Sequence, residues 1–281
     1  MLFRNREGIG TVAISQTRLG KGWSIMILAI DIGNTNIVIG CIDQDTIYFV
    51  ERMSTDQGKT DLEYAIGFKT VLELYQIASD QVKACMVSSV VPPINNTIKR
   101  AIRKILGLEA IFVGPGVKTG LNITIDNPGQ LGCDLVVNAV AAIQDYPTEG
   151  PLIVIDMGTA TTMSVIDRKK NYIGGVIIPG IRVALDALVG RTAQLRRISL
   201  EAPKKTIGRN TIDCMKSGAI LGNASMIDGM IDRIQEELGE NATVIATGGL
   251  ARFITEHCRH EIIFDDALLL KGLLYIYEKN R

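Results

Sequence analysis

Two apolar runs in this chain each end in the same kind of short polar turn. Residues 25–30 lead into Asp31-Ile32-Gly33-Asn34-Thr35-Asn36, and residues 152–155 lead into Asp156-Met157-Gly158-Thr159-Ala160. A continuous apolar run predicts a strand that is buried on both faces, so each run is expected to carry an aspartate to a polar edge. More apolar residues follow each turn, which predicts a β-hairpin in both places.

The rest of the chain alternates between helical and extended patterns. Apolar side chains at helical spacing predict helices over residues 61–78 and 94–106 and a long helix that begins near 207–211. Strands are predicted at 82–87, 110–113, 173–178 and 242–246. This alternation indicates an α/β layer structure. Because the hairpin at residue 31 recurs at residue 156, we expect two halves related by duplication, residues 26–146 and 147–281, joined by a polar linker near 144–150.

Size and charge narrow the class of protein. The 281 residues, 47% of them hydrophobic, are enough for a buried core. Equal numbers of basic and acidic residues, 30 of each, give no electrostatic reason to expect nucleic acid or an anionic membrane as a partner. No apolar run approaches the roughly 20 residues that span a bilayer. Residues 1–25 lack the apolar region of a secretory signal, so we expect a disordered tail or an extension that precedes a start at Met26.

Cysteine and histidine usage indicates neither a zinc site nor a disulfide framework. The five cysteines are odd in number, widely separated and without a CxxC pair, which favours the reducing cytoplasm. His257 and His260 are close in sequence and fit a metal pair or, more simply, an exposed loop; we assign them no role.

The two turns carry residues suited to phosphate. Small residues let backbone N–H groups approach phosphate oxygens, and the hydroxyls of Thr35, Thr159 and Thr161 add donors. Each aspartate can hold a cation against phosphate charge. The same residues are also typical of ordinary hairpin turns. Their recurrence behind two buried strands favours phosphate, and the arrangement resembles the phosphate-binding motifs of the acetate and sugar kinase, heat-shock ATPase and actin superfamily.

Three other motifs bear on function. Asp134 falls near the predicted start of a helix, where it fits either an N-cap or a carboxylate that accepts a proton from a substrate hydroxyl. Gly248-Gly249 follows a predicted strand and lets the backbone approach a flat ring such as adenine. Gly58-Lys59-Thr60 is not a P-loop, because Met53 stands where that motif needs its first glycine.

Taken together, these motifs resemble the type III pantothenate kinases from about Met26 to the C-terminus. The matching stretches are Asp31-Ile-Gly-Asn-Thr-Asn36, Val87-Ser-Ser-Val-Val-Pro92, Gly132-Cys-Asp134, Asp156-Met-Gly-Thr-Ala-Thr-Thr162, Gly175 through Gly180, Gly208-Arg-Asn-Thr211 and Thr247-Gly-Gly-Leu-Ala251. Their joint order and spacing are more specific than any one of them.

The resemblance implies two actin-like (ribonuclease H-like) domains with the nucleotide in the cleft between them, and a homodimer. It implies transfer of the ATP γ-phosphoryl group to the primary hydroxyl of pantothenate, with Mg²⁺ and a monovalent cation, K⁺ or NH₄⁺. By the resemblance Asp134 is the general base, Asp31 lies near Mg²⁺ and Asp156 holds the monovalent cation. The implied ATP-binding residues are Asp31, Ile32, Gly33, Asn34, Thr35, Asn36, Ile37, Val38, Gly158, Thr159, Gly248 and Gly249. The implied pantothenate-binding residues are Ile125, Gly132, Cys133, Leu135 and Thr211.

The chain departs from the family pattern at two of these positions. Leu135 stands where many members have arginine, and Ile125 stands where a tyrosine is usual. Losing one charge-assisted hydrogen bond to the pantothenate carboxylate costs about 1.5 to 3 kcal/mol, unless another cation such as Arg182 or Arg209 replaces it. Two alternatives follow: a kinase of the same fold with a different small acceptor, or a nucleotide-binding regulatory protein without turnover. The three aspartates argue against the second.

Overall fold

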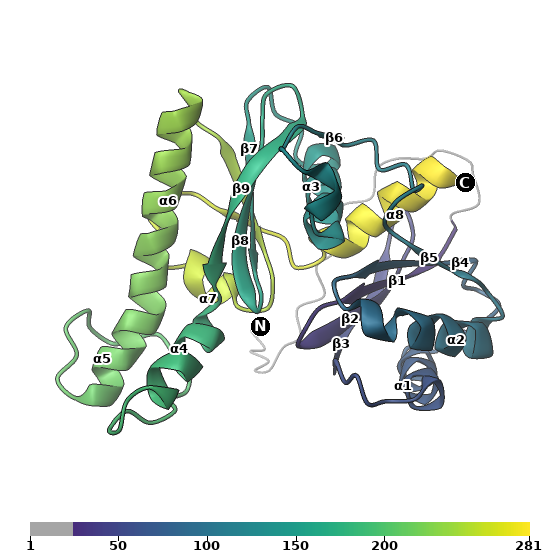
Figure 1. Ribbon diagram of the computed structural model, residues 1–281, viewed down its shortest axis with the longest axis horizontal. Helices are drawn as coiled ribbons and strands as arrows, with labels where there is room; N and C mark the ends of the chain where they lie inside the picture. The colour runs from purple at the N-terminus through teal and green to yellow at the C-terminus, as the bar shows by residue number, and fades with distance from the viewer. Residues whose placement is uncertain (1–24) are drawn as a thin grey trace, which may run out of the picture.

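The computed structural model describes residues 25–281, which form a mixed α/β fold with two sheets (Figure 1). The first sheet has the order β3-β2-β1-β4-β5, and the second has the order β11-β10-β7-β8-β9-β6. The strands are β1 (Ile27–Ile32), β2 (Asn36–Ile42), β3 (Ile47–Ser54), β4 (Ala84–Ser89), β5 (Ala110–Phe112), β6 (Asn122–Ile123), β7 (Leu152–Met157), β8 (Ala160–Ile166), β9 (Asn171–Pro179), β10 (Thr243–Thr247) and β11 (Ile263–Phe264).

The two sheets repeat one topology, which confirms the predicted duplication. In the first sheet β1, β2 and β3 are antiparallel neighbours, while β4 and β5 run parallel to β1. In the second sheet β7, β8 and β9 are antiparallel neighbours, while β10 and β11 run parallel to β7. The two-residue strand β6 is an addition, because it pairs with β9 and has no counterpart in the first sheet.

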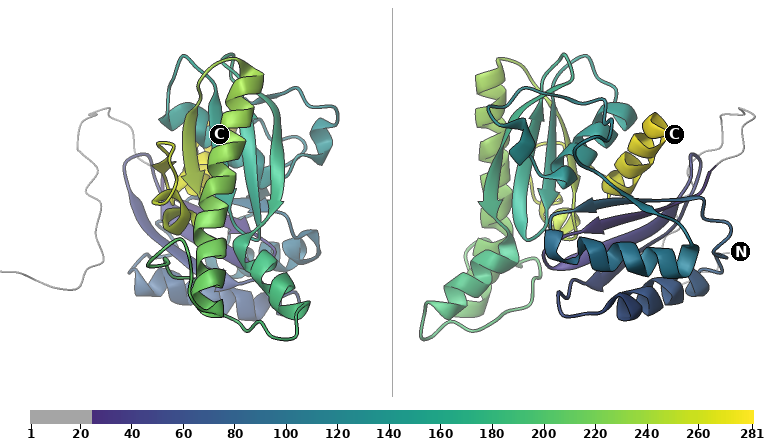
Figure 2. Two further views of the ribbon diagram at one scale, coloured as in Figure 1. Left: turned by 90° about the vertical axis from the view of Figure 1, so that its left-hand side faces the viewer. Right: turned by 45° about the vertical axis from the view of Figure 1, so that its right-hand side comes forward.

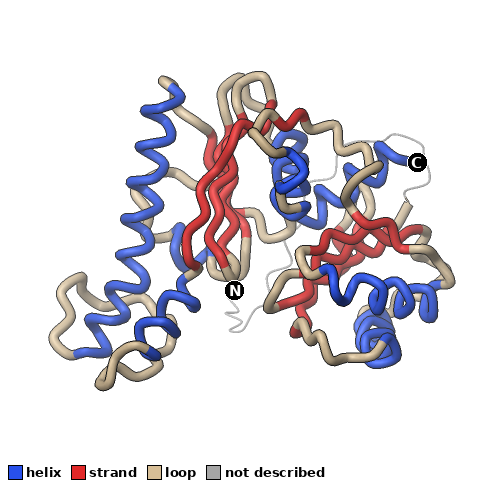
Figure 3. The backbone as a smooth tube through the Cα atoms, viewed as in Figure 1, coloured by secondary structure: helices blue, strands red, loops and turns tan. Residues whose placement is uncertain are grey.

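Helices cover the outer face of each sheet. On the first sheet, α1 (Asp61–Leu74) and α2 (Asn95–Leu106) enclose one core; α1 starts at a capping box between Thr60 and Glu63, and α2 ends at Gly107 in the left-handed conformation. On the second sheet, a π-helical segment (Gly218–Gly222), α6 (Asn223–Leu238) and α7 (Ala251–Thr255) enclose another core. The helices α4 (Ile181–Gly190) and α5 (Thr211–Ser217) lie beyond this second sheet (Figure 3).

Two helices lie between the sheets, α3 (Cys133–Asp145) and α8 (Leu268–Asn280) (Figure 2). Val137 and Val140 of α3 pack toward the first sheet, whereas Ala139 and Ala142 pack toward the second. Gly272 of α8 lies against the Val137 carbonyl, where a Cβ atom would come within 2.2 Å. The α3–α8 pair is therefore the packed connection between the two halves.

Strands β1 and β7 are buried on both faces, as their apolar runs predict. In β1, Leu28, Ile30 and Ile32 face the outer core and Ile27 and Ala29 face the inner core. In β7, the same alternation places Ile153, Ile155 and Met157 outward and Leu152 and Val154 inward. Because side chains alternate along a strand, Asp31 and Asp156 both belong to the inner faces, the faces that α3 covers.

The predicted elements are present, with differences at their ends. The first predicted helix ends at Leu74 rather than residue 78, and the predicted long helix is α5 and α6 joined through the π-helical segment. Residues 144–150, the expected linker, include the end of α3 and most of the connection to β7, yet β6 and α8 each pack with the half on the other side of it. The expectation for residues 1–25 lies, apart from Ile25, outside the described residues.

Candidate active site

The two hairpin turns meet between the sheets. The turn between β1 and β2 is closed by a 3.0 Å hydrogen bond from the Gly33 N–H to the Asn36 carbonyl, and the turn between β7 and β8 by one of 3.0 Å from the Gly158 N–H to the Ala160 carbonyl. Across the gap, the hydroxyl oxygens of Thr35 and Thr159 lie 2.9 Å apart and share a hydrogen bond. The duplicated turns thus face one another, as two halves of a phosphate clamp should.

Asp31, at the end of β1, has a carboxylate oxygen without a protein partner. Its Oδ1 is buried and accepts no hydrogen bond from the described residues, although Ser88 donates to the carboxylate. Burial raises the pKa of Asp31 from 3.8 to about 8; the negative charges of Asp134 and Asp156 add to this shift, and the Ser88 hydrogen bond opposes it. A buried carboxylate oxygen that lacks a hydrogen-bond partner fits a cation ligand.

Asp156, at the equivalent position on β7, receives a hydrogen bond from a neighbouring helix. Asn138 on α3 donates a 3.0 Å hydrogen bond from Nδ2 to Asp156 Oδ2. Burial raises the pKa of Asp156 to about 6, the charge of Asp134 adds to this, and Asn138 and Arg52 lower it. Asn138 Oδ1 and Thr162 Oγ1 are themselves buried without a hydrogen-bond partner among the described residues, and Thr162 is the cross-strand partner of Asp156. Unsatisfied oxygens beside a carboxylate suit a weakly hydrated cation.

Asp134 lies in the first turn of α3, between the two hairpins. The N-cap of α3 is Gly132, without a side-chain cap bond, so Asp134 is not the N-cap residue. Its carboxylate folds back over Gly132, where an added Cβ would lie 2.4 Å from Asp134 Oδ1. Burial raises the pKa of Asp134, while the backbone N–H groups of Asp134 and Leu135 lower it. A carboxylate with a raised pKa facing two phosphate turns is suited to take a proton.

Cys133 fixes this turn to the first sheet. Its Sγ accepts a hydrogen bond from the Ser89 N–H at 3.1 Å and donates to the Ser89 carbonyl at 3.2 Å. It also lies 3.4 Å from the hydroxyl of Ser88, the residue that donates to Asp31. Asp31 and the Asp134 turn are therefore connected through Ser88 and Cys133.

The Gly248-Gly249 turn closes the side of the site near Asp156. Gly248 has a φ of +99°, and a Cβ there would lie 2.6 Å from the Met157 nitrogen and 2.7 Å from Asp156 Oδ1. Only glycine suits this conformation and this close approach. A Cβ on Gly249 would lie 2.5 Å from Nη1 of Arg52, so Arg52 of the first half reaches the second half here.

Not every expected site residue comes to this place. Leu135 follows Asp134 on α3 and is partly buried, whereas Ile125 packs against the inner core of the second sheet. Thr211 begins α5, which Figure 1 shows at the side of the molecule away from α3. Thr211 is thus on a helix drawn apart from α3, the helix that carries Asp134.

Three residues of the site, Ser88, Asn138 and Arg52, were not predicted from the sequence. Ser88 belongs to the stretch that carried the family resemblance, and no role was attached to it. Asn138 had one local signal, since it is the one polar residue in the apolar run 135–142. Arg52 had none, because an arginine on a strand is ordinary.

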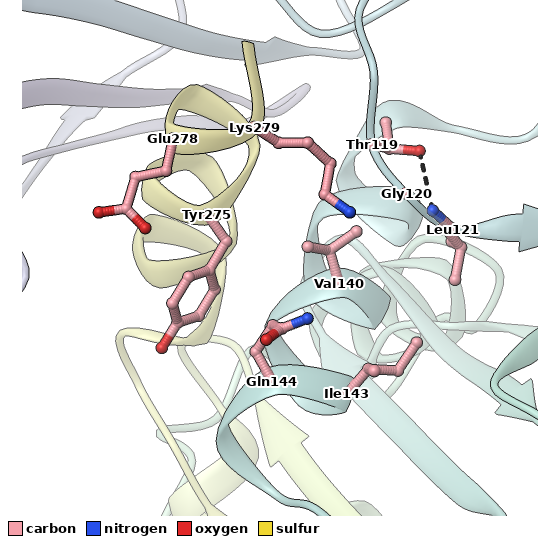
Figure 4. A pocket seen from close by; sticks show the side chains of 9 residues that line it. All are labelled: Thr119, Gly120, Leu121, Val140, Ile143, Gln144, Tyr275, Glu278 and Lys279. Atoms are coloured by element: carbon pink, nitrogen blue, oxygen red, sulfur yellow. Dashed lines mark hydrogen bonds between the residues drawn. The ribbon is translucent and has the colours of Figure 1, made fainter. Parts of the chain in front are cut away.

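Two cavities lie outside this constellation of aspartates. One, of about 280 Å³, lies between the 119–121 loop, α3 and α8 and is lined by Gln144, Tyr275 and Lys279 among others (Figure 4). The other, of about 450 Å³, is lined by α4, residues 197–200, Leu250 and Phe253. Leu250, which lines the second cavity, directly follows Gly249 in the chain.

This chain is similar to known proteins over most of its length. A protein-family model described as type III pantothenate kinase matches residues 27–233. A type III pantothenate kinase from Exiguobacterium sp. is 47% identical over 256 residues, which cover 91% of this chain and 100% of that protein. The enzyme of that name from Bacillus cytotoxicus is 44% identical over 255 residues, which cover 91% of this chain and 97% of that protein.

Solved structures share the fold at low sequence identity. A conserved Baf family protein from Campylobacter jejuni superposes with a TM-score of 0.55 at 21% identity, covering 90% of this chain and 98% of that one. Component A of (R)-2-hydroxyglutaryl-CoA dehydratase from Acidaminococcus fermentans superposes with a TM-score of 0.52 at 16% identity, covering 90% and 97%. These likenesses concern the fold alone. In the described residues, no helix is long and apolar enough to cross a membrane.

Proposed function

This chain belongs to the type III pantothenate kinase family, and from that premise we propose that it transfers the γ-phosphoryl group of ATP to the primary hydroxyl of pantothenate, the first step of coenzyme A synthesis. The observation that carries the proposal is the position of Asp134, whose charge acts on both Asp31 and Asp156. A base next to two phosphate turns is what this reaction needs.

In this proposal the chain's own residues position and neutralise the reactants. The backbone of the first turn, residues 31–38, and the second turn, Gly158 and Thr159, hold the ATP phosphates between them. Gly248 and Gly249 leave room for the nucleotide on the second half. Asp134 orients the acceptor hydroxyl and takes its proton as the new phosphate ester bond forms and the bond from the γ-phosphorus to the bridging oxygen breaks, which releases ADP.

The residues fit the two cations that the family implies. Asp31 Oδ1 is a buried oxygen without a partner, as a Mg²⁺ ligand should be. Asp156, with Asn138 Oδ1 and Thr162 Oγ1, suits a monovalent cation such as K⁺ or NH₄⁺. When bound, these cations supply positive charge to the phosphoryl group.

The surface around Thr211 supports a homodimer. Large apolar side chains are exposed on α4, on α5 and near both, which is unusual for a free surface. They are Ile207 (82% exposed), Ile212, Val183 and Leu188. We propose that a second copy covers this face and brings its Thr211 to the acceptor site.

Five free cysteines in the described residues support a cytoplasmic location.

The test is ADP production by the purified protein with Mg-ATP and K⁺, with and without pantothenate, and detection of 4'-phosphopantothenate by mass. Pantothenate-dependent turnover that disappears when K⁺ is removed supports the proposal. Intact nucleotide binding with no phosphorylated pantothenate contradicts it and directs the search to other acceptors.

Leu135 gives a second, narrower test of the acceptor. If pantothenate is the acceptor and its carboxylate lacks the usual arginine, Leu135→Arg should lower the KM for pantothenate about tenfold. Leu135→Met, which conserves volume without charge, is the matched control. An unchanged KM in Leu135→Arg would favour a kinase with a different small acceptor.

A further inference from the structure

Arg52 is the basic side chain that crosses from one half of the molecule to the other at the candidate site. It lies on β3 opposite Val38 of β2, which in turn lies opposite Asp31 of β1. Cross-strand partners share a face of the sheet, so Arg52 and Asp31 are on the same inner face. The Arg52 guanidinium then extends to Gly249 on the second half.

The contact with Gly249 depends on the absence of a side chain there. A Cβ on residue 249 would lie 2.5 Å from Arg52 Nη1, 3.5 Å from Cζ and 3.8 Å from Nη2. All three atoms belong to the guanidinium, so it is the charged end of Arg52 that occupies this space. Gly249 has no unusual φ that would require glycine for backbone reasons. Here glycine makes room for a cation.

The guanidinium has no carboxylate partner in the structure. Among the ion pairs formed within residues 25–281, none involves Arg52. The hydrogen bonds that arginine side chains donate within these residues come from Arg100 and Arg168. Arg52 is nonetheless close enough to Asp156 to lower the pKa of that carboxyl. A structural arginine would normally pair with the nearest carboxylate, whereas Arg52 is an exposed residue whose guanidinium donors have no such partner.

We propose that Arg52 binds the phosphate chain of the nucleotide, holding it against the Gly248-Gly249 turn when the two halves close. This inference rests on the proposed kinase function and adds a nucleotide-binding residue to it. A planar guanidinium has several N–H donors that match phosphate oxygens. It also supplies positive charge at a site where three aspartates supply none. Its position beside Gly249 and Asp156 assigns it to the nucleotide and not to the acceptor.

Binding experiments without an acceptor test this assignment. Calorimetry measures the affinity for the non-hydrolysable analogue AMPPNP, in the presence of Mg²⁺, for wild type, Arg52→Gln and Arg52→Lys. The control is Arg103→Gln, because Arg103 is an exposed arginine on α2 that pairs with Glu109. We expect about a ten- to hundredfold loss in Arg52→Gln, a smaller loss in Arg52→Lys, and no change in the control. Steady-state kinetics should show a raised KM for ATP and an unchanged KM for pantothenate.

Gly249→Ala supplies an independent variant. Its methyl group displaces the end of a flexible side chain and leaves the backbone alone, so the protein should fold, which thermal melting checks. We expect it to weaken AMPPNP binding, and to add little to the loss already present in Arg52→Gln, because both changes remove one interaction.

Three results overturn the inference. They are an AMPPNP affinity of Arg52→Gln within twofold of Arg103→Gln, a loss confined to pantothenate, and fully additive losses in the double variant. If wild type binds AMPPNP and fails to phosphorylate pantothenate, the proposed function is wrong, while the binding measurements still decide the role of Arg52.

Discussion

The two hairpins are the same structure built twice, and their aspartates have different surroundings. Asp31 has one buried oxygen with no partner and a pKa raised to about 8. Asp156 receives a hydrogen bond from Asn138, is near Arg52, and has a pKa raised only to about 6. Duplication fixed the backbone, and the neighbouring elements then gave each carboxylate its own character.

The same difference appears one and two strands away. In the first sheet the row that starts at Asp31 continues through Val38 to Arg52. In the second sheet the row that starts at Asp156 continues through Thr162 to Ile177, which is 74% exposed. The row in the first sheet therefore ends in a cation, whereas the row in the second sheet has a hydroxyl followed by an exposed apolar side chain. Equivalent positions in the two sheets thus carry side chains of different chemistry.

The largest effect is expected at Asp134, which belongs to neither hairpin and faces both. Asp134→Asn keeps the shape of the side chain and removes its ability to accept a proton. We expect turnover to fall by about 10²- to 10⁴-fold with ATP affinity changed less than about twofold. Turnover and AMPPNP binding measured on one preparation separate the two. Unchanged turnover would remove Asp134 from the chemistry.

Exchanging the two hairpin aspartates for asparagine, one at a time, tests the comparison directly. Asp31→Asn should lower kcat/KM about a hundredfold and raise the Mg²⁺ concentration needed for half activity, because the neutral amide lacks the negative charge that holds the cation. Asp156→Asn should lower kcat/KM about tenfold and should act mainly on the K⁺ dependence of the activity. Mg²⁺ and K⁺ titrations of both variants check this. Identical responses would mean that the hairpins are interchangeable.

The raised pKa values predict how the stability of the metal-free protein depends on pH. Between about pH 4 and 8 native Asp31 holds a proton that the unfolded chain has released, so the free energy of unfolding falls as pH rises through this window. For Asp156 the window is about pH 4 to 6. Melting temperatures in chelator should therefore decline from pH 5 to 8. Asp31→Asn should flatten the decline above pH 6, and Asp156→Asn should flatten only the part below it. A decline above pH 6 that persists in Asp31→Asn would assign it to another group.

The smallest effect is expected at the contact between the turns. Thr35→Val and Thr159→Val each remove the hydroxyl pair, and because both threonines are exposed each should cost the free protein about 0.5 kcal/mol. The double variant should be no less stable than either single one. A phosphoryl group placed between these hydroxyls, now 2.9 Å apart, would separate them, so AMPPNP should reduce the difference between variants and wild type. Additive losses would show that the hydroxyls act separately.

The hairpins and their aspartates were predictable because their signals are local. An apolar run, a carboxylate and a turn of small residues lie within a dozen positions, and the repeat reveals the duplication. Asn138 and Arg52 were not predictable, since each acts on a residue of another element through tertiary packing. The packing of β6 and α8 across the expected boundary was not predicted either, since it also depends on tertiary packing. In addition, a two-residue strand such as Asn122–Ile123 has no periodicity to detect.

The position of α8 has a consequence for synthesis. Leu270, Leu273 and Leu274 complete the inner core of the first sheet, against strands made early in translation. At about 5 to 20 residues per second, the interval between completing β5 and completing α8 is roughly 10 to 30 s. During that time the apolar inner face of the first sheet lacks the leucine side chains of α8. The half that leaves the ribosome first is thus the half that finishes its core last.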